Sequence, residues 1–129
     1  MPIVCAHENN IAWFDVPVTD LDRAVRFYSA VLGSAATIEK SGSIPIGMLP
    51  TPDGGTMGCL VPGNEAKPSL HGVMVWFDVE GRLKEAVLAA TANGGKVLGD
   101  IHAIGNFGFR SEVQDSEGNR IALYSNSNP

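Results

Sequence analysis

The 129-residue sequence has little of what several classes of protein require. Its only cysteines are Cys5 and Cys59, which are too few and too differently placed to make a disulfide framework. Lysine and arginine number 9 against 14 aspartates and glutamates, so the formal net charge is −5. A nucleic acid or an anionic membrane would require a basic face, and we therefore expect neither as a partner.

Long hydrophobic runs are also missing from the sequence. No apolar stretch approaches the roughly 20 residues of a membrane helix. Residues 1–9 lack the features of a signal peptide and are expected to form an unstructured lead. The glycine-rich segments do not match motifs that bind nucleotide phosphates. With 44% hydrophobic and 18% charged residues, the composition is that of an ordinary globular domain, and we expect a cytoplasmic protein.

What the sequence does contain is an internal repeat. The letters Trp-Phe-Asp-Val begin at Trp13 and return at Trp76, 63 residues later. A glycine-led apolar run begins at Gly55 and another at Gly118, again 63 residues apart. Two landmarks at one spacing indicate a duplication.

Each half predicts one strand, one helix and three further strands. Apolar and polar residues alternate over 11–18, which places Trp13 and Asp15 on the face opposite the apolar residues. The expected strands are 11–18, 35–40, 44–49 and 56–61 in the first half, and 72–79, 96–100, 108–113 and 118–125 in the second. The segment from Asp115 to Asn119 predicts a hairpin turn.

The helices are expected over 20–33 and 81–93. Thr19 and Asp22 have the spacing of a weak capping box at the first helix, and Gly33 has the position of its C-cap. The inward residues of the first helix are expected to be Leu21, Ala24, Val25, Tyr28, Val31 and Leu32. Those of the second are expected to be Leu83, Ala86, Val87 and Ala90.

This order predicts an α+β fold in a single domain over 1–129. A module of about 10–62 and one of about 71–126 flank a polar, breaker-rich linker over 63–70. A sheet covered by one helix leaves its other face open, and two such sheets cover each other by curving around a shared interior. We predict two βαβββ modules that form a curved, barrel-like eight-stranded sheet around a central cleft.

The phrase over 13–28, Trp-Phe-Asp-Val-Pro-Val-Thr-Asp-Leu-Asp-Arg-Ala-Val-Arg-Phe-Tyr, resembles the vicinal oxygen chelate superfamily. Segments 94–97 and 115–121 agree with that resemblance, which covers about 10–126. Its members include glyoxalase I, bleomycin-resistance proteins, fosfomycin-resistance enzymes, extradiol dioxygenases and methylmalonyl-CoA epimerase. The resemblance implies the fold and pairing of two chains as a homodimer, and says little about the reaction.

Enzymes of that superfamily hold a divalent metal in the cleft, usually with His, Glu or Gln. The resemblance places the four ligand positions on Trp13, Cys59, either Met74 or Trp76, and Ala122. Tryptophan and alanine offer no lone pair, and methionine is a poor ligand for a hard divalent ion. We therefore expect no metal cofactor and assign no catalytic residue.

The candidate ligand-binding residues are those expected to face the cleft. They are Trp13, Asp15, Cys59, Met74, Trp76, Asp78, His102, Phe107, Arg120 and Tyr124. Indole walls stack on aromatic or cationic ligands. Arg120 and Tyr124 share the face of Ala122 as polar anchors, whereas His102 and Phe107 lie in a loop-like segment beside the cleft.

Three functions are consistent with these residues. We favour a small-molecule binding protein of the glyoxalase/bleomycin-resistance type that holds a small organic ligand and lacks the metal site. The alternative is a metal-dependent glyoxalase-like lyase or isomerase, or a ring-cleaving dioxygenase, that recruits other ligands such as His71, His102 or Glu112. A third possibility is an interaction module whose aromatic surface contacts a partner.

Overall fold

The structure, a computed structural model, describes residues 10–52, 55–63, 65–127 and 129 of the chain. The expected unstructured lead over 1–9 lies outside these residues. The described part contains two helices and eight strands, in this order: β1 (Trp13–Val18), α1 (Leu21–Leu32), β2 (Thr37–Glu39), β3 (Ile46–Met48), β4 (Met57–Pro62), β5 (Val75–Asp78), α2 (Leu83–Ala92), β6 (Lys96–Ala103), β7 (Phe109–Gln114) and β8 (Arg120–Ser125).

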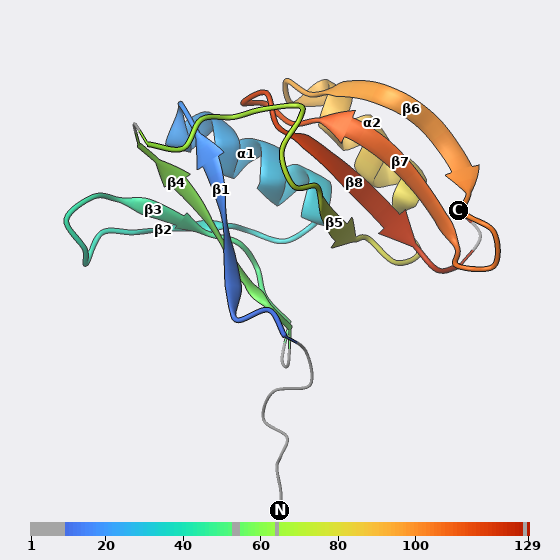
Figure 1. The fold of residues 1–129 in the computed structure, drawn as a ribbon, viewed down its shortest axis with the longest axis horizontal. Coiled ribbons are helices and arrows are strands. Elements are labelled where there is room, and N and C mark those ends of the chain that lie inside the picture. The colour runs from blue at the N-terminus through green and yellow to red at the C-terminus, as the bar shows by residue number, and fades with distance from the viewer. Residues whose placement is uncertain (1–9, 53–54, 64, 128) are drawn as a thin grey trace, which may run out of the picture.

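The strands form two sheets with the same internal order. The first is β1-β4-β3-β2 and the second is β5-β8-β7-β6. In each sheet the first and last strands of the module are parallel, and the other neighbours are antiparallel. The predicted pair of βαβββ modules is confirmed. Over the described residues the two sheets remain separate and do not close into the expected barrel (Figure 1).

Strand β1 has the two faces that its alternation predicts. Val16 and Val18 are buried, whereas Trp13 and Asp15 are exposed. Because β1 lies at the edge of its sheet, it tolerates Pro17, which has no N–H to donate to a neighbouring strand.

Two boundaries differ from the prediction in ways that affect the site. Strand β6 continues to Ala103, so His102 lies in a strand and not in the expected loop. Register shifts between Val97 and Gly99 and between Gly99 and His102 interrupt the alternation without ending the strand. Strand β5 begins only at Val75, so Met74 precedes it.

Helix α1 is capped differently from the prediction. Its N-cap is Asp20, whose carboxylate accepts the N–H of Arg23 at 3.1 Å. Thr19 instead donates its hydroxyl to Glu117 at 2.9 Å. The predicted capping box is therefore wrong, because a partner distant in sequence engages the threonine. At the other end, Gly33 has φ 70° and forms the expected left-handed C-cap.

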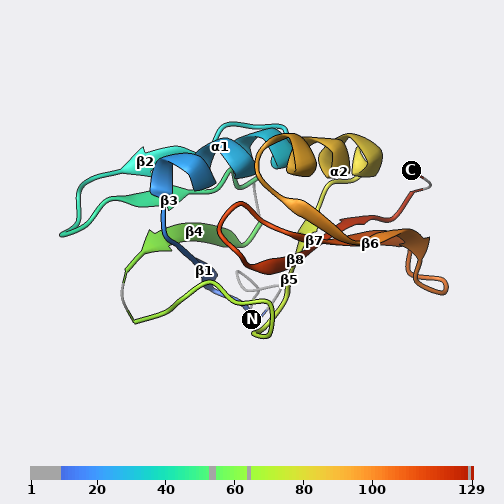
Figure 2. The ribbon, with the colours of Figure 1, turned by 90° about the horizontal axis from the view of Figure 1, so that it is seen from above.

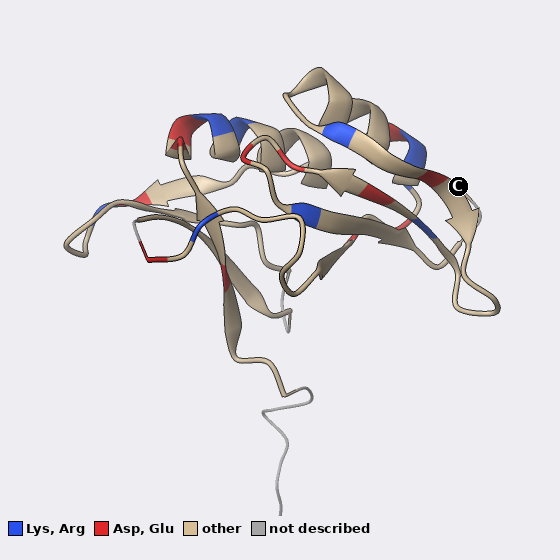
Figure 3. Cartoon of the chain, turned by 45° about the horizontal axis from the view of Figure 1, so that its top comes forward, with Lys and Arg blue, Asp and Glu red and all other residues tan. Residues whose placement is uncertain are grey.

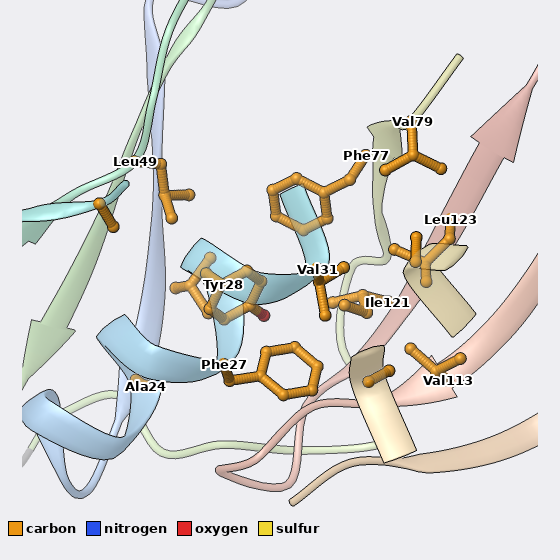
Figure 4. Packing of buried hydrophobic residues seen from close by; sticks show 14 of the residues in the cluster. Ala24, Phe27, Tyr28, Val31, Leu49, Phe77, Val79, Val113, Ile121 and Leu123 are labelled. Carbon is orange, nitrogen blue, oxygen red and sulfur yellow. The ribbon is translucent and has the colours of Figure 1, made fainter. Parts of the chain in front are cut away.

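One hydrophobic core joins the two modules. Both helices lie on one side of the sheets (Figure 2). From α1, Phe27, Tyr28 and Val31 are fully buried and project toward residues of the second sheet (Figure 4). The Tyr28 ring lies 5.4 Å from that of Phe77 on β5. Phe27 was missing from the predicted stripe, which is therefore wider than expected.

The turn between β7 and β8 fixes the second module to α1. Asp115 accepts the backbone N–H groups of Glu117, Gly118 and Asn119 at 2.8, 2.9 and 2.9 Å. It also accepts the hydroxyl of Tyr28 at 2.5 Å. The predicted hairpin turn is confirmed, and its first residue anchors the helix of the other module.

Charge distribution and helix length can be described for the folded chain. Acidic and basic residues are scattered over sheets and helices (Figure 3) and do not gather into one basic region of the described chain. Among the described residues, neither helix is long and apolar enough to cross a membrane.

Candidate functional site

One face of the second sheet turns away from the helices and carries five of the ten predicted ligand-binding residues. Cross-strand partners point to the same side of a sheet. Three rows of cross-strand partners lie on this open face. In the strand order β6, β7, β8, β5, the first two are His102, Arg110, Tyr124 and Asp78, followed by Gly99, Glu112, Ala122 and Trp76. The third row holds Lys96, Gln114 and Arg120. The opposite face holds the buried residues Phe77, Val113, Ile121 and Leu123.

Arg110 crosses the open face to reach Trp76. Its guanidinium carbon lies 5.0 Å from the centroid of the Trp76 ring, within the range of a cation–π contact. One of its Nη atoms lies 3.4 Å from the carboxylate of Glu112. Its Nε donates to Nε2 of His102 at 3.3 Å. Because Nε2 accepts, Nδ1 of His102 carries the proton that the Asp100 carbonyl accepts at 2.9 Å.

Glu112 holds a second arginine on the same face. Arg120 donates its Nε to one oxygen of the Glu112 carboxylate at 2.8 Å, and one of its Nη atoms lies 2.7 Å from the same oxygen. Ala122 lies in register between Glu112 and Trp76 and is fully covered by its neighbours. Because the Ala122 side chain is only a methyl group, the Arg110 side chain can extend across the sheet to the Trp76 indole.

Tyr124 connects this face to the hairpin between β6 and β7. Its ring lies 6.1 Å from that of Trp76, and its hydroxyl donates to the carbonyl of Phe107 at 2.5 Å. The Phe107 side chain is 75% exposed. The hairpin tip is thus fixed to the sheet, while its aromatic ring faces solvent.

The open face of the first sheet holds three further candidates. Trp13 is 63% exposed, and Asp15 is the cross-strand partner of Cys59. Cys59 is buried, with its sulfur 3.9 Å from that of Met48. Burial, and then the negative charge of Asp15, raise the pKa of the Cys59 thiol. The thiol is therefore a packed apolar group and a weak nucleophile at neutral pH.

A hollow of about 600 Å³ lies between the modules. Its aromatic wall includes Phe14 of β1 and Phe77 of β5, whose rings meet edge-on at 5.9 Å. Phe14 packs directly on Gly58, where a side chain has no room. Among the residues that the structure describes, the lining comprises Phe14, Leu32, Ser34, Leu49, Pro50, Thr51, Pro52, Gly55, Thr56, Gly58, Trp76, Phe77 and Asp78. This described lining is mainly apolar, with a few hydroxyls and one carboxylate.

A smaller hollow of about 230 Å³ lies beside the linker. Asp15, Lys67 and Arg120 are its charged lining residues. Of the predicted residues, Trp76 and Asp78 therefore meet at the larger hollow and Asp15 and Arg120 at the smaller. Trp76, Asp78, His102, Arg120 and Tyr124 share the open face of the second sheet, and the structure leaves Trp13 and Cys59 apart from them.

The predicted metal positions do not offer a ligand set. Trp13 pairs with position 57 in the first sheet, and the 63-residue repeat makes position 120 the equivalent of position 57. Trp76 pairs with Ala122, so extending that register by two residues puts Met74 opposite position 120. Met74 is therefore the register equivalent of Trp13. The four positions are then Trp, Cys, Met and Ala. In the part of the chain that the structure describes, no three His, Cys, Asp or Glu side chains are grouped to hold a metal. These residues do not fit the metal of the superfamily.

Sequence reasoning missed Arg110, Phe14 and Phe77 as site residues. Arg110 alternates with Glu112 along β7 and could have been found from that pattern. The alternation correctly predicts that Phe14 and Phe77 lie on the core face. It does not predict that the hollow opens on that face at the junction of the modules. Nothing in their local sequence indicates this.

Comparisons with known proteins agree with this architecture. The model of the Glyoxalase/Bleomycin resistance protein/Dioxygenase superfamily matches residues 10–123. A glyoxylase-like domain-containing protein of Didymella fabae is 31% identical over 125 residues, which span 88% of this chain and 91% of that protein.

Solved structures show the same fold at low sequence identity. A glyoxalase/bleomycin resistance protein from Albidiferax ferrireducens T118 has a TM-score of 0.74 at 19% identity, covering 92% of this chain and 98% of its own. The genomically encoded fosfomycin resistance protein FosX from Listeria monocytogenes has a TM-score of 0.68 at 13% identity, covering 94% and 96%. A mutant of that protein was solved in complex with Mn(II) and 1S,2S-dihydroxypropylphosphonic acid.

Proposed function

This chain belongs to the Glyoxalase/Bleomycin resistance protein/Dioxygenase superfamily, and from that premise we propose that it binds a small organic molecule in the hollow between its modules, without a metal. The observation that carries the proposal is the hollow of about 600 Å³ with Phe14, Phe77 and Trp76 in its wall. Small-molecule sites commonly have this size, are mostly apolar and lie at interfaces between structural units.

The lining suggests the chemical character of the ligand. Phe14 and Phe77 offer an aromatic wall for a flat apolar body. Asp78 is the charged group of the lining over the described residues, and one of its oxygens accepts the N–H of Glu80 at 3.0 Å. A ligand with an apolar body and a hydrogen-bond donor or cationic group toward Asp78 suits this arrangement.

The enzymatic alternatives have less support from the described contacts. His102 accepts a hydrogen bond from Arg110 at one ring nitrogen and donates from the other. Glu112 is shared by two arginines. A metal would have to displace these partners. Purified protein is expected to contain less than one-tenth of an equivalent of Zn, Ni, Mn or Fe, and a full equivalent would contradict the metal-free proposal.

Ligand binding in the hollow can be tested by filling it. Ser34 lines the hollow, whereas Ser43 is exposed and does not line it. Nile red, an uncharged fluorescent probe, is expected to bind the wild type saturably. Ser34→Trp should weaken that binding at least tenfold, and Ser43→Trp should leave it unchanged. Equal binding to both folded variants would contradict the proposal.

We also propose that the chain forms a homodimer, as superfamily members often do. The edge strands β1 and β5 leave one side without a partner strand among the described residues. Near these edges, Trp13 is 63%, Met57 41%, Val73 95% and Trp76 43% exposed. A second copy would cover this apolar surface. Light scattering should give twice the monomer mass for the wild type and a lower mass for Trp13→Glu; a wild-type monomer would contradict the proposal.

A further inference from the structure

A glycine on β4 forms part of the wall of the hollow between the modules. Gly58 is buried and is the cross-strand partner of Phe14 on β1. A Cβ atom at position 58 would lie 2.7 Å from Cε2 of the Phe14 ring and 2.9 Å from Cδ1 of Leu49. Because non-bonded carbon atoms pack at about 3.5–4.0 Å, the ring occupies the place where another residue would carry its side chain.

The backbone at position 58 does not itself require glycine. Gly58 is not among the glycines of the described chain that have a positive φ. It lies within a strand, where glycine is less favourable than alanine. The close approach of the Phe14 ring, and not the backbone conformation, therefore excludes a side chain here.

The corresponding pair of the second module lacks a glycine. Phe77 is the counterpart of Phe14 in the 63-residue repeat, and its cross-strand partner is the fully buried Leu123. The phenylalanine of the first module thus lies over bare backbone, whereas that of the second faces a full side chain. The first module also contributes most of the described lining of the hollow.

A displaced Phe14 ring has one direction in which to move. Strand β4 lies behind it, and Leu49 holds the neighbouring place because its backbone N–H donates to the Gly58 carbonyl at 3.0 Å. Leu49 and Phe77 project from the two modules toward their junction (Figure 4). The Phe77 ring lies 5.9 Å from that of Phe14. A side chain at position 58 would therefore push the Phe14 ring away from the sheet and into the hollow.

We propose that Gly58 determines the size of the ligand that the hollow accepts, and that this ligand is a flat polycyclic molecule. The inference rests on the proposed binding of a small organic molecule in the hollow. With the Phe14 ring against β4, the hollow of about 600 Å³ has the size of sites for drug-sized ligands. The face of an aromatic ring suits the stacking of a flat body. Gly58 acts through Phe14 and is a positioning residue.

Two uncharged fluorescent probes of different size test this selection with the full chain. Nile red has four fused rings and 2-naphthol has two. The wild type should bind both, and Nile red more tightly because it buries more apolar surface. Gly58→Ala should weaken the binding of Nile red at least tenfold and that of 2-naphthol less than threefold. Equal losses for the two probes, or no loss for either, would overturn the proposal.

A control and a double variant attribute the effect to the ring. Gly99→Ala adds a methyl within β6 at a glycine that also lacks a positive φ, and no atom lies within 4 Å of that methyl. It should bind both probes as the wild type does. In a Phe14→Leu background, Gly58→Ala should change Nile red binding less than twofold, because leucine has no atom at the position of Cε2. A tenfold effect that persists in this background would overturn the proposal.

Phe14→Trp tests the same limit without a change at position 58. Its larger ring should project into the hollow and weaken Nile red binding more than 2-naphthol binding, so the test does not depend on the folding of Gly58→Ala. Circular dichroism verifies that each variant is folded. Wild-type binding of both probes to Phe14→Trp would overturn the proposal. Failure of both probes to bind the wild type would contradict the proposed function and this inference with it, whereas normal wild-type binding that none of the substitutions changes would contradict the role of Gly58 alone.

Discussion

Glu117, on the turn between β7 and β8, forms an ion pair with Arg23 of α1 at 2.7 Å. The same carboxylate accepts the backbone N–H groups of Thr19 at 2.9 Å and Asp20 at 2.8 Å. These N–H groups lie at the start of α1, where the helix dipole favours negative charge. A residue of the second module therefore completes the N-terminus of the helix of the first.

This contact predicts a loss of stability in acid. Burial alone would raise the pKa of Glu117, but hydrogen bonds from Arg23 and from the N–H groups of Asp20 and Thr19 outweigh it and lower the pKa to about 2. Because the folded-state pKa is depressed, the stabilisation is complete above the ordinary pKa of about 4.5 and declines as the pH falls toward 2. Glu117→Gln should lower the free energy of unfolding by about 2 kcal/mol at pH 7.

Urea unfolding at a series of pH values measures this difference. The wild type and Glu117→Gln should converge between about pH 4.5 and pH 2, where the wild-type carboxylate becomes protonated. Glu65→Gln removes a charge from an exposed position and should follow the wild type throughout. A Glu117→Gln defect of equal size at pH 7 and pH 2 would contradict the electrostatic explanation.

A second prediction concerns the buried pair of Tyr28 and Asp115. Their side chains meet at 2.5 Å, and the two residues are 0% and 1% exposed. Tyr28→Phe removes a donor from a buried carboxylate and should cost about 1–3 kcal/mol of unfolding free energy in urea denaturation. Tyr124→Phe removes a hydroxyl hydrogen bond at the surface and should cost less. Equal losses in the two variants would show that burial of the acceptor is unimportant.

Much of the fold follows from local sequence. The alternation over β1 correctly separates buried Val16 and Val18 from exposed Trp13, because period two is a property of any half-buried strand. The 63-residue repeat predicts two equivalent sheets, because similar half-sequences form similar modules.

What could not be predicted depends on partners distant in sequence. Thr19 is a residue type that commonly caps helices, yet its hydroxyl donates a hydrogen bond to Glu117, 98 residues away. His102 follows an irregular stretch that resembles a loop, yet pairing with Arg110 keeps it in β6. Phe14 and Phe77 line the hollow and meet edge-on, although they lie in different modules, and no periodicity in the sequence predicts that contact.

A third prediction compares two glycines that have nearly the same positive φ. Gly33 has φ 70° and Gly81 has φ 75°, so alanine is strained at both by about 1 kcal/mol. Only at Gly33 would the added methyl meet another group, the Arg82 guanidinium at 2.8 Å. That guanidinium donates to the carbonyl of Val31 at 3.1 Å, near the end of α1. Displacing it should make Gly33→Ala the more destabilising by about 1 kcal/mol.

Thermal unfolding of both glycine variants measures the comparison. Gly81→Ala is the control for backbone strain, because no atom lies within 4 Å of its added methyl. In an Arg82→Ala background, Gly33→Ala should lower the melting temperature by less than it does in the wild type. The guanidinium that the added methyl would meet is absent from that background. Equal melting temperatures for Gly33→Ala and Gly81→Ala would contradict a role for Arg82.

The last prediction concerns the reactivity of Cys59. Burial, and then the charge of Asp15 on the neighbouring strand, raise the pKa of its thiol, so little thiolate is present at pH 8. In a Cys5→Ser background, which leaves Cys59 as the one cysteine of the sequence, labelling by a disulfide reagent should be at least tenfold slower than in the urea-unfolded chain. Asp15→Asn removes the negative charge but keeps the side-chain size, and should accelerate labelling severalfold. Asp100→Asn removes the same charge from an exposed position on the other sheet and should not. If the three proteins react at one rate, access to the buried sulfur and not its pKa limits the reaction.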